Sequence, residues 1–338
     1  VESIEQVFTG QPNFGQRVTA TVSRNGDLIN NVVLQFQLPR LTVADVYGNT
    51  SIGNGTVAWT NWVAHALVTD CEFEIGGQKI DKHFGIWYQI WNELTQVAEK
   101  WNGYASMVGG YASNTGLIGN ADSARVYYVP LMFYFNRNPG LSLPLIALQY
   151  HEVKIGFWFR PANELIVVLN PDGTRRTESN TSSIANNSNV QLQGATLFID
   201  YVYLDTDERR RMAQMAHEYL IEQLQHTSPE DVTFGSSSQF KTRLNFNHPV
   251  KELIWVLQRK INATAGTAYN DWFNFGSGNP GAVDLSGTTD LMASGKLMLN
   301  GHDRFVPRPQ TYFRLVQPWQ THTRVPQNFV YNYSFALR

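Results

Sequence analysis

Apolar and polar positions alternate along much of the first 204 residues, as they do in half-buried β-strands. An Arg-Asn-Gly-Asp turn at 24–27 and a Gly-Gly turn at 76–77 separate successive runs of this pattern. The pattern predicts strands at 18–22, 32–38, 68–75, 78–83, 126–135, 143–159 and 195–204. The first part of the chain is therefore predicted to be an antiparallel β structure.

One helix is predicted inside this β-rich part. Its apolar residues recur every three or four positions, and they are Trp87, Ile90, Trp91, Leu94, Ala98 and Trp101. An aromatic ligand platform would show the same spacing, but an apolar helix face normally packs against a core. We therefore expect this helix to cover an open end of a β-sandwich. Polar loops are predicted at 106–123 and 170–194.

A short linker helix is predicted where the β pattern stops. Asp205 or Thr206 can cap it, and apolar residues then follow at helical spacing as Met212, Met215, Ala216, Tyr219 and Leu220. This helix divides the chain into three parts. They are a first half at 1–204, the linker helix at 205–218 and a second half at 219–338.

The second half repeats features of the first. FEIGGQKI at 73–80 is similar to LMLNGHDR at 297–304, and RNGDLINNVVLQ at 24–35 is similar to FNHPVKELIWVL at 246–257. The two pairs are separated by nearly the same number of residues along the chain. Chance similarities have no reason to share one separation. We therefore predict a duplicated sandwich, with a polar loop at 262–295 and strands at 243–246, 253–257, 296–299, 312–316 and 329–337.

Two strand regions of the first half have no counterpart at the end of the second. They lie at 153–159 and 196–204, whereas only Ala336, Leu337 and Arg338 follow Phe335. A sandwich that lacks two strands would leave its edges and core uncovered. We therefore expect the natural chain to continue past Arg338, or another chain to supply these strands.

The composition suits two packed cores with large contact surfaces. The 338 residues exceed one ordinary core, and 43% of them are hydrophobic. Charged residues make up only 16% and the net charge is −2, which disfavours direct binding of nucleic acid. Cys71, the single cysteine, lies in an apolar run and indicates a buried thiol in a reducing compartment. No apolar run is long enough to span a bilayer.

Catalytic and metal-binding motifs are absent from the sequence. The eight histidines do not cluster, and the adjacent His151 and Glu152 would point to opposite faces of a strand. Asp27, Asp81 and Asp303 each follow a glycine-containing turn, where an acceptor of local hydrogen bonds is commoner than a catalytic carboxylate. We therefore expect no enzymatic activity, no cofactor and no metal.

Two other features of the sequence each allow a functional or a purely structural interpretation. Arg209, Arg210 and Arg211 could bind an acidic partner, although a solvated helix face is the commoner role of such a run. Sequons for N-glycosylation occur at Asn49, Asn54, Asn180, Asn186, Asn262 and Asn332. Asn180 and Asn186 lie in a polar loop and are the better candidates, whereas Asn332 lies in a predicted strand and is the weakest.

Seven stretches, in order along almost the whole chain, carry a resemblance to a known family. They are SRNGDLI at 23–29, EIGGQKIDKH at 74–83, YVPLMFYFNRNPGLSLPLIALQYHEVKI at 128–155, DYVYLDTDERRRMAQMAHEYLIEQLQ at 200–225, LNFNHPVKELIW at 244–255, LNGHDRF at 299–305 and YSFAL at 333–337. Together they resemble the major capsid proteins of nucleocytoplasmic large DNA viruses, in particular those of chlorella viruses and other algal viruses.

The resemblance implies an all-β fold of two consecutive eight-stranded jelly rolls joined by a short linker helix at about 205–214, with residues 219–225 as the first strand of the second. It also implies a homotrimeric capsomer of pseudo-hexagonal outline in an icosahedral virion shell, assembled in the host cytoplasm. Neighbouring capsomers, minor capsid proteins and an internal membrane beneath the shell are the implied partners. Family members also carry segments before the equivalent of Val1 and after that of Leu337.

Two other classes of function compete with this reading. A carbohydrate-binding jelly roll of the lectin type would suit exposed aromatic residues and polar loops. A cupin-like or glycosidase enzyme would need a metal cluster or a carboxylate pair, and the sequence shows neither.

Overall fold

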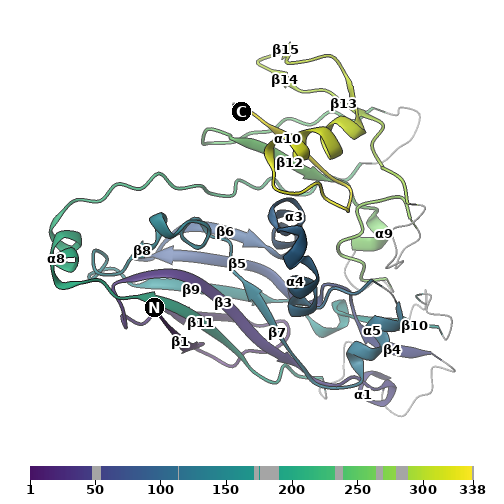
Figure 1. Ribbon diagram of the computed structural model, residues 1–338. Coiled ribbons are helices and arrows are strands. Elements are labelled where there is room, and N and C mark those ends of the chain that lie inside the picture. The colour runs from purple at the N-terminus through teal and green to yellow at the C-terminus, as the bar shows by residue number, and fades with distance from the viewer. Residues whose placement is uncertain are drawn as a thin grey trace.

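The computed structural model describes residues 1–47, 55–112, 114–170, 175, 190–232, 239–263, 269–278 and 288–336. Its first half contains two antiparallel sheets (Figure 1). One has the order β1 (Glu2–Val7), β11 (Ala195–Val202), β3 (Leu28–Leu38) and β7 (Arg125–Pro130), with the short β8 (Leu143–Pro144) also paired to β3. The other has the order β2 (Arg17–Thr21), β9 (Val153–Phe159), β5 (Val68–Ile75) and β6 (Gln78–Phe84). The antiparallel sandwich expected in the first half is therefore present.

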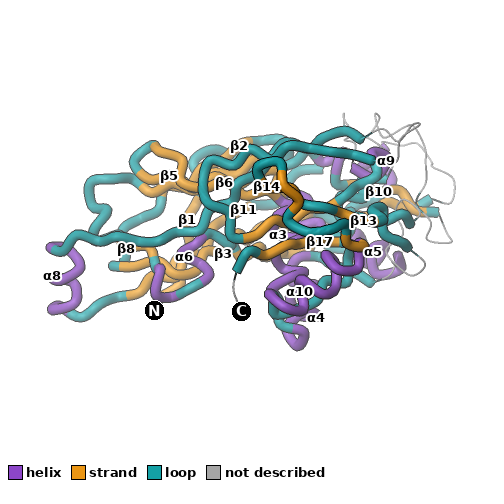
Figure 2. The backbone as a smooth tube through the Cα atoms, turned by 90° about the horizontal axis from the view of Figure 1, so that it is seen from above, coloured by secondary structure: helices purple, strands orange, loops and turns teal. Residues whose placement is uncertain are grey.

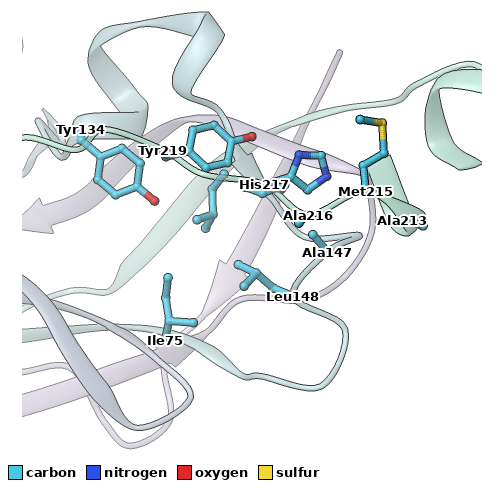
Figure 3. A pocket seen from close by; sticks show the side chains of 11 residues that line it. Ile75, Tyr134, Ala147, Leu148, Ala213, Met215, Ala216, His217 and Tyr219 are labelled. Atoms are coloured by element: carbon cyan, nitrogen blue, oxygen red, sulfur yellow. The ribbon is translucent and has the colours of Figure 1, made fainter. Parts of the chain in front are cut away.

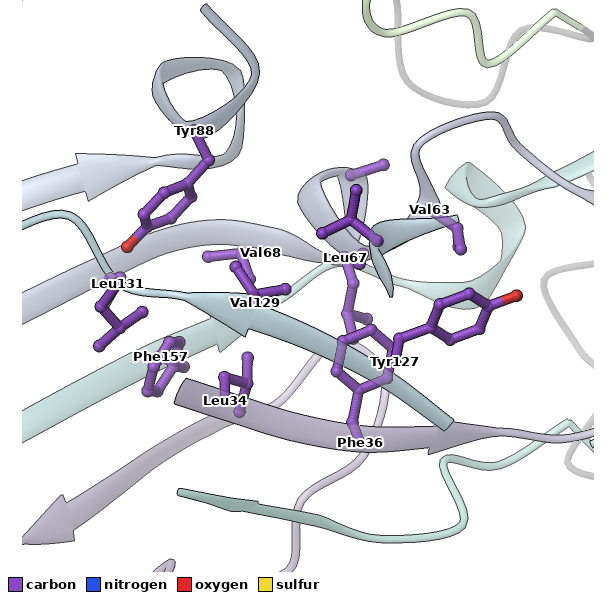
Figure 4. Close-up of a cluster of buried hydrophobic side chains, with 14 of the residues drawn as sticks. Leu34, Phe36, Val63, Leu67, Val68, Tyr88, Tyr127, Val129, Leu131 and Phe157 are labelled. Atoms are coloured by element: carbon purple, nitrogen blue, oxygen red, sulfur yellow. The ribbon is translucent and has the colours of Figure 1, made fainter. Parts of the chain in front are cut away.

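Strict alternation of side chains builds the core between these sheets. Every second residue is buried along β11 and along β3 from Val32 to Leu38, so that each of these runs presents one apolar face inward. Figure 4 shows Leu34 and Phe36 of β3 with Val129 of β7 and Phe157 of β9 in this core. Burial of each such side chain contributes about 2 kcal/mol to folding.

Helices and a small sheet cover one end of the sandwich (Figure 1). The sheet pairs β4 (Thr56–Trp59) with β10 (Ile166–Leu169). The helices are α1 (Val43–Tyr47), α2 (Val63–Leu67), α3 (Gly85–Thr95), the short η1 (Ala98–Lys100), α4 (Trp101–Val108) and α5 (Asn114–Ala121). The expected cover is therefore present, and the tube view shows α3 and α4 as separate helices (Figure 2).

Several boundaries predicted from the pattern are wrong. The aromatic helix expected at 87–101 is broken, because the backbone is extended at Gln96 and at Val97. The polar loop at 106–123 contains α5 and the end of α4. The strand expected at 126–135 ends at Pro130 and is followed by α6 (Tyr134–Arg137). The strand expected at 143–159 is divided into β8 and β9. Two short 3₁₀ helices flank this stretch, η2 (Pro139–Leu141) before it and η3 (Ala162–Glu164) after it.

The second half forms less regular structure than predicted. Its described residues contain three two-stranded sheets: β12 (Glu252–Val256) with β17 (Val330–Ser334), β13 (Ser294–Gly295) with β16 (Arg308–Pro309), and β14 (Met298–Leu299) with β15 (His302–Asp303). The helical elements there are α9 (Lys260–Ala263), the π-helix η4 (Tyr312–Val316) and α10 (Gln317–Thr321). An eight-stranded sandwich is not formed by this part of the described chain.

Three predicted strands of the second half are therefore wrong. Residues 243–246 and 219–225 have no regular secondary structure, since neither segment pairs with a strand among the described residues. Residues 312–316 form a π-helix that buries Phe313 against Trp255. A short apolar run fits a helix as well as a strand, and in this case the packing favours the helix.

Two local features of the second half are comparable to features of the first. The β5–β6 turn has positive φ angles of 59° at Gly76 and 80° at Gly77, and the β14–β15 turn has 51° at Asn300 and 83° at Gly301. These angles suit the tight hairpin turns read from the sequence. The antiparallel β12–β17 ladder also corresponds in chain order to the β3–β7 ladder.

A buried histidine makes the first half sensitive to acid. His65 of α2 is fully buried, with Nδ1 2.8 Å from Gln89 Oε1 and Nε2 2.6 Å from the Tyr104 hydroxyl. Burial lowers the pKa of His65 from 6.5 to about 4, so the folded chain keeps this ring neutral.

We expect the free energy of unfolding to fall as the pH drops from 6.5 towards 4. In this window the unfolded chain binds a proton at His65 that the folded chain excludes, which costs about 3 kcal/mol. Urea unfolding of the wild type and of His65→Gln at several pH values measures the effect. The variant is expected to lose less stability over this window, and equal pH slopes would contradict the assignment.

Candidate functional site

The two halves are joined by a segment of the second half at 269–275, which we call the seam segment. Asn270 is fully buried, and its side-chain amide donates to the carbonyl oxygens of Asn163 at 2.9 Å and Ile166 at 2.8 Å. In return Thr60 Oγ1 donates to the Asn270 carbonyl at 2.7 Å. Asn270 has a φ of 40°, a left-handed conformation that Asn tolerates better than most residues. Three hydrogen bonds therefore join Asn270 to the first half, while its buried Oδ1 has no hydrogen-bond partner.

A tryptophan and an arginine extend this contact. Trp272 Nε1 donates to the Glu164 carbonyl at 2.8 Å, and the Arg160 guanidinium lies 3.7 Å from the Trp272 ring centroid. Arg160 also forms an ion pair with Glu164 at 2.9 Å. Arg175 is buried beside the same segment, 3.7 Å from Asp271. The seam segment is therefore held by stacking and by buried charge as well as by hydrogen bonds.

A second contact between the halves lies at α3 and α4. Arg324 donates its backbone N–H to the Leu94 carbonyl at 3.1 Å, and its guanidinium lies 3.7 Å from the Trp101 ring centroid. Gln327 N donates to Glu93 Oε2 at 3.1 Å. Burial raises the pKa of Glu93 above its ordinary value. With two separate contacts, the second half is fixed in orientation as well as in position.

The connection between the halves runs along an edge of the sandwich (Figure 1). The linker helix α8 (Thr206–Gln214) is capped by Asp205, whose Oδ1 accepts from Thr206 N at 2.7 Å. It ends at Gln214 rather than at 218, because Met215 is already extended. Further along, Leu224 N donates to Asp81 Oδ1 at 3.2 Å and the His226 ring lies 4.5 Å from that of Phe84. Residues 223–226 therefore lie beside β6, the edge strand of its sheet.

A half-open pocket of about 370 Å³ lies beside this connection (Figure 3). The side chains that line it are apolar apart from those of His217, Tyr134 and Tyr219. His217 Nε2 donates to the Met212 carbonyl at 2.6 Å. The described residues contain no group of three or more His, Cys, Asp or Glu side chains that could hold a metal ion.

The three turn aspartates have structural partners. Asp27 Oδ2 accepts from Leu204 N at 2.8 Å and pairs with Arg209 at 2.9 Å, so its contacts are distant in sequence rather than local as predicted. Asp81 accepts from Lys82 N at 2.8 Å, as expected for a local acceptor. Asp303 pairs with Lys296 at 2.9 Å.

The cysteine and two of the asparagine sequons lie in the described part of the chain, and all three side chains are buried. Burial raises the pKa of the Cys71 thiol, as expected for an inert buried cysteine. Asn262 is fully buried in α9 and so cannot accept a glycan in this fold, which corrects its candidacy. Asn332 is buried in β17 and donates to Glu252 Oε1 at 2.6 Å. The remaining sequons, at Asn49, Asn54, Asn180 and Asn186, lie outside the described residues.

The seam segment was missed because it lies in a stretch predicted as polar loop at 262–295. Trp272, Phe273 and Phe275 form an aromatic cluster inside that stretch, and this was the signal available in the sequence. As for membranes, no helix within the described ranges has the length and apolar character needed to cross a bilayer.

Comparison with known proteins agrees with this architecture. Residues 1–205 match the family model for the N-terminus of the major capsid protein, and residues 208–338 match that for the major capsid protein of large eukaryotic DNA viruses. The major capsid protein of Pyramimonas orientalis virus is 46% identical over 331 residues, covering 98% of this chain and 69% of that protein. That of Paramecium bursaria Chlorella virus 1 is 39% identical over 352 residues, covering 100% of this chain and 74% of that protein.

A solved structure is similar over the whole chain as well. A chain in a quasi-atomic model of the PBCV-1 virus capsid superimposes with a TM-score of 0.74 at 35% identity, covering 100% of this chain and 78% of that chain. The chain described here therefore belongs to the major capsid proteins of large eukaryotic DNA viruses, which are structural components of the virion capsid and not enzymes.

Proposed function

We propose that three copies of this chain form a capsomer of pseudo-hexagonal outline, to which each copy contributes two jelly rolls. The order β1-β11-β3-β7 opposite β2-β9-β5-β6 supports this for the first half, since two four-stranded layers joined in this order make a jelly roll. For the second half, the support is the repeated β5–β6 hairpin and the β12–β17 ladder. Completion of the second jelly roll requires further strands beyond those formed by the described residues.

The observation that carries the proposal is the fixed relation of the two halves. The seam segment and the contact of Arg324 with Trp101 hold the two halves in one orientation. A threefold ring of such double units has six similar lobes, which is the symmetry that a hexagonal lattice requires. Contacts around this ring would be heterologous and would close. Obligate interfaces of this type bury on the order of 2,000 Å² or more.

The surroundings of such a capsomer belong to the same proposal. Neighbouring capsomers and minor capsid proteins would contact its sides, and its base would face an internal membrane. Assembly would take place in the host cytoplasm, consistent with a single buried thiol. Asn49, Asn54, Asn180 and Asn186 stay candidates for surface glycans.

Light scattering coupled to size-exclusion chromatography tests the trimer. At micromolar concentration we expect a particle with the mass of three chains, because the interfaces of obligate oligomers are too large and apolar to stay exposed. A stable, soluble monomer under these conditions would contradict the proposal.

A further inference from the structure

A row of buried polar side chains runs from α4 and α2 to the contact between the two halves at α3. His65 of α2 has Nδ1 2.8 Å from Gln89 Oε1 and Nε2 2.6 Å from the Tyr104 hydroxyl. Gln89 and Glu93 are one turn apart on α3, and the Gln89 side chain hydrogen-bonds to the Glu93 carboxylate. The exposed fractions are 0% for His65, 1% for Gln89 and 4% for Glu93, so water does not compete for these hydrogen bonds. We call these four residues the buried relay.

The Glu93 end of the buried relay touches the second half. Gln327 N donates to Glu93 Oε2 at 3.1 Å, and the backbone of Asn328 also hydrogen-bonds to the carboxylate. Arg324 is the cation of the second half that faces it. Burial raises the pKa of Glu93 and outweighs these contacts, which act in the opposite direction. Glu93 therefore takes up a proton at a higher pH than an exposed glutamate does, and it does so at a contact between the halves.

The Tyr104 end of the buried relay lies beside an acceptor that no donor uses. The Asn92 side chain is within hydrogen-bond reach of the Tyr104 hydroxyl, and its Nδ2 donates to the Tyr88 carbonyl at 2.8 Å. Asn92 Oδ1 is buried and has no hydrogen-bond partner among the described residues. A buried acceptor without a donor is costly, so a turn of the Tyr104 hydroxyl towards Asn92 would relieve that cost.

Two arrangements of hydrogen atoms fit these positions. With Glu93 ionised, the Gln89 amide donates to the carboxylate and Gln89 Oε1 accepts from His65 Nδ1–H. The free His65 Nε2 then accepts from the Tyr104 hydroxyl. With Glu93 protonated, its hydroxyl donates to Gln89 Oε1, and the rotated amide donates to His65 Nδ1. His65 Nε2–H then donates to Tyr104, whose own proton turns to Asn92 Oδ1. One proton enters from solvent at Glu93, and the ring carries one proton in both arrangements.

We propose that protonation of Glu93 at the contact between the halves changes the His65 tautomer from Nδ1–H to Nε2–H through Gln89. The tautomer of a neutral imidazole is set by the hydrogen bonds of its two nitrogens, so a reversal at Gln89 decides it. The His65 ring also lies against Phe273 of the seam segment, with 6.2 Å between the ring centroids. The buried relay therefore touches both contacts between the halves. Water that reaches Glu93 when residues 324–328 move away favours the ionised carboxylate and returns the ring to Nδ1–H.

NMR of the chain with ¹⁵N-labelled histidine rings tests this change, because the two tautomers give different shifts at Nδ1 and Nε2. Between about pH 8 and pH 4.5 we expect the ratio of the two His65 tautomers to change by about tenfold or more. The ring stays uncharged over this range, since burial lowers its pKa to about 4. His83 is the control in the same spectra. It is buried outside the relay, with Nε2 3.1 Å from Asp81 Oδ2, and is expected to keep one tautomer.

Two variants separate the relay from a fixed network. In Glu93→Gln the new amide turns its oxygen to Gln327 N–H and its NH₂ group to Gln89, as a protonated carboxyl does, so Nε2–H is expected throughout the pH range. Gln89→Met cuts the relay and is expected to make the His65 tautomer independent of pH. Circular dichroism verifies that both variants are folded.

A wild-type His65 tautomer that stays the same over the whole range overturns the proposal. So does a Glu93→Gln variant that keeps the Nδ1–H tautomer at the upper end of the range. Neither result bears on the proposed trimer, because the buried relay lies within one chain.

Discussion

Replacing Gly85 with alanine is expected to prevent the first half from folding. A Cβ atom at this position would overlap the backbone carbonyl oxygens of His65 and Val68. Both belong to backbone at the junction of α2 and β5, which cannot shift without disturbing the buried residues around it. We expect a loss of more than about 4 kcal/mol, measured as absence of a cooperative urea transition.

Gly103→Ala provides the matched control. Gly103 lies within α4, and a Cβ atom there would meet nothing within 4 Å. Alanine in a helix interior is favoured over glycine by up to about 1 kcal/mol, so this variant is expected to be as stable as the wild type or slightly more stable. If both variants folded equally well, the close packing of α3 against α2 and β5 would be refuted.

Removing the Asn270 side chain is expected to loosen the second half from the first. In Asn270→Ala the carbonyl oxygens of Asn163 and Ile166 lose the two hydrogen bonds that the amide donates. Alanine also tolerates the left-handed backbone less well than asparagine. Together these effects amount to about 3 kcal/mol at the seam. Hydrogen exchange is expected to rise in 269–275 and 162–169 and to stay unchanged in β3.

An exposed asparagine serves as the control for this change. Asn247 is exposed and uses only its backbone N–H in the described hydrogen bonds, so Asn247→Ala is expected to leave exchange at the seam unchanged. Equal protection of 269–275 in Asn270→Ala and in the wild type would show that this amide does not hold the halves together.

The sequence predicted the sandwich of the first half well because its strands carry strict alternation. β5, at Val68–Ile75, has the predicted limits, and the turns at Gly77 and Gly301 have the positive φ angles that their glycines indicated. Alternation with a period of two indicates which face of a strand is buried, and β3 follows this rule from Val32 to Leu38.

Two kinds of feature could not be predicted from such patterns. Asn270 and Trp272 act through partners more than 100 residues away, and the aromatic cluster around Trp272 does not indicate which residues it contacts. In η4, an apolar run became a π-helix because burial of Phe313 against Trp255 outweighed its strand propensity. Both outcomes depend on tertiary contacts, which periodicity does not encode.

Electron microscopy of the purified chain tests the central claim most directly. If three copies of a chain with two similar sandwiches assemble, every particle must show six similar lobes around a threefold axis. Each particle must then contain three chains. Class averages with this outline are the predicted result. Particles of one chain, or rings with any other number of copies, would contradict the account.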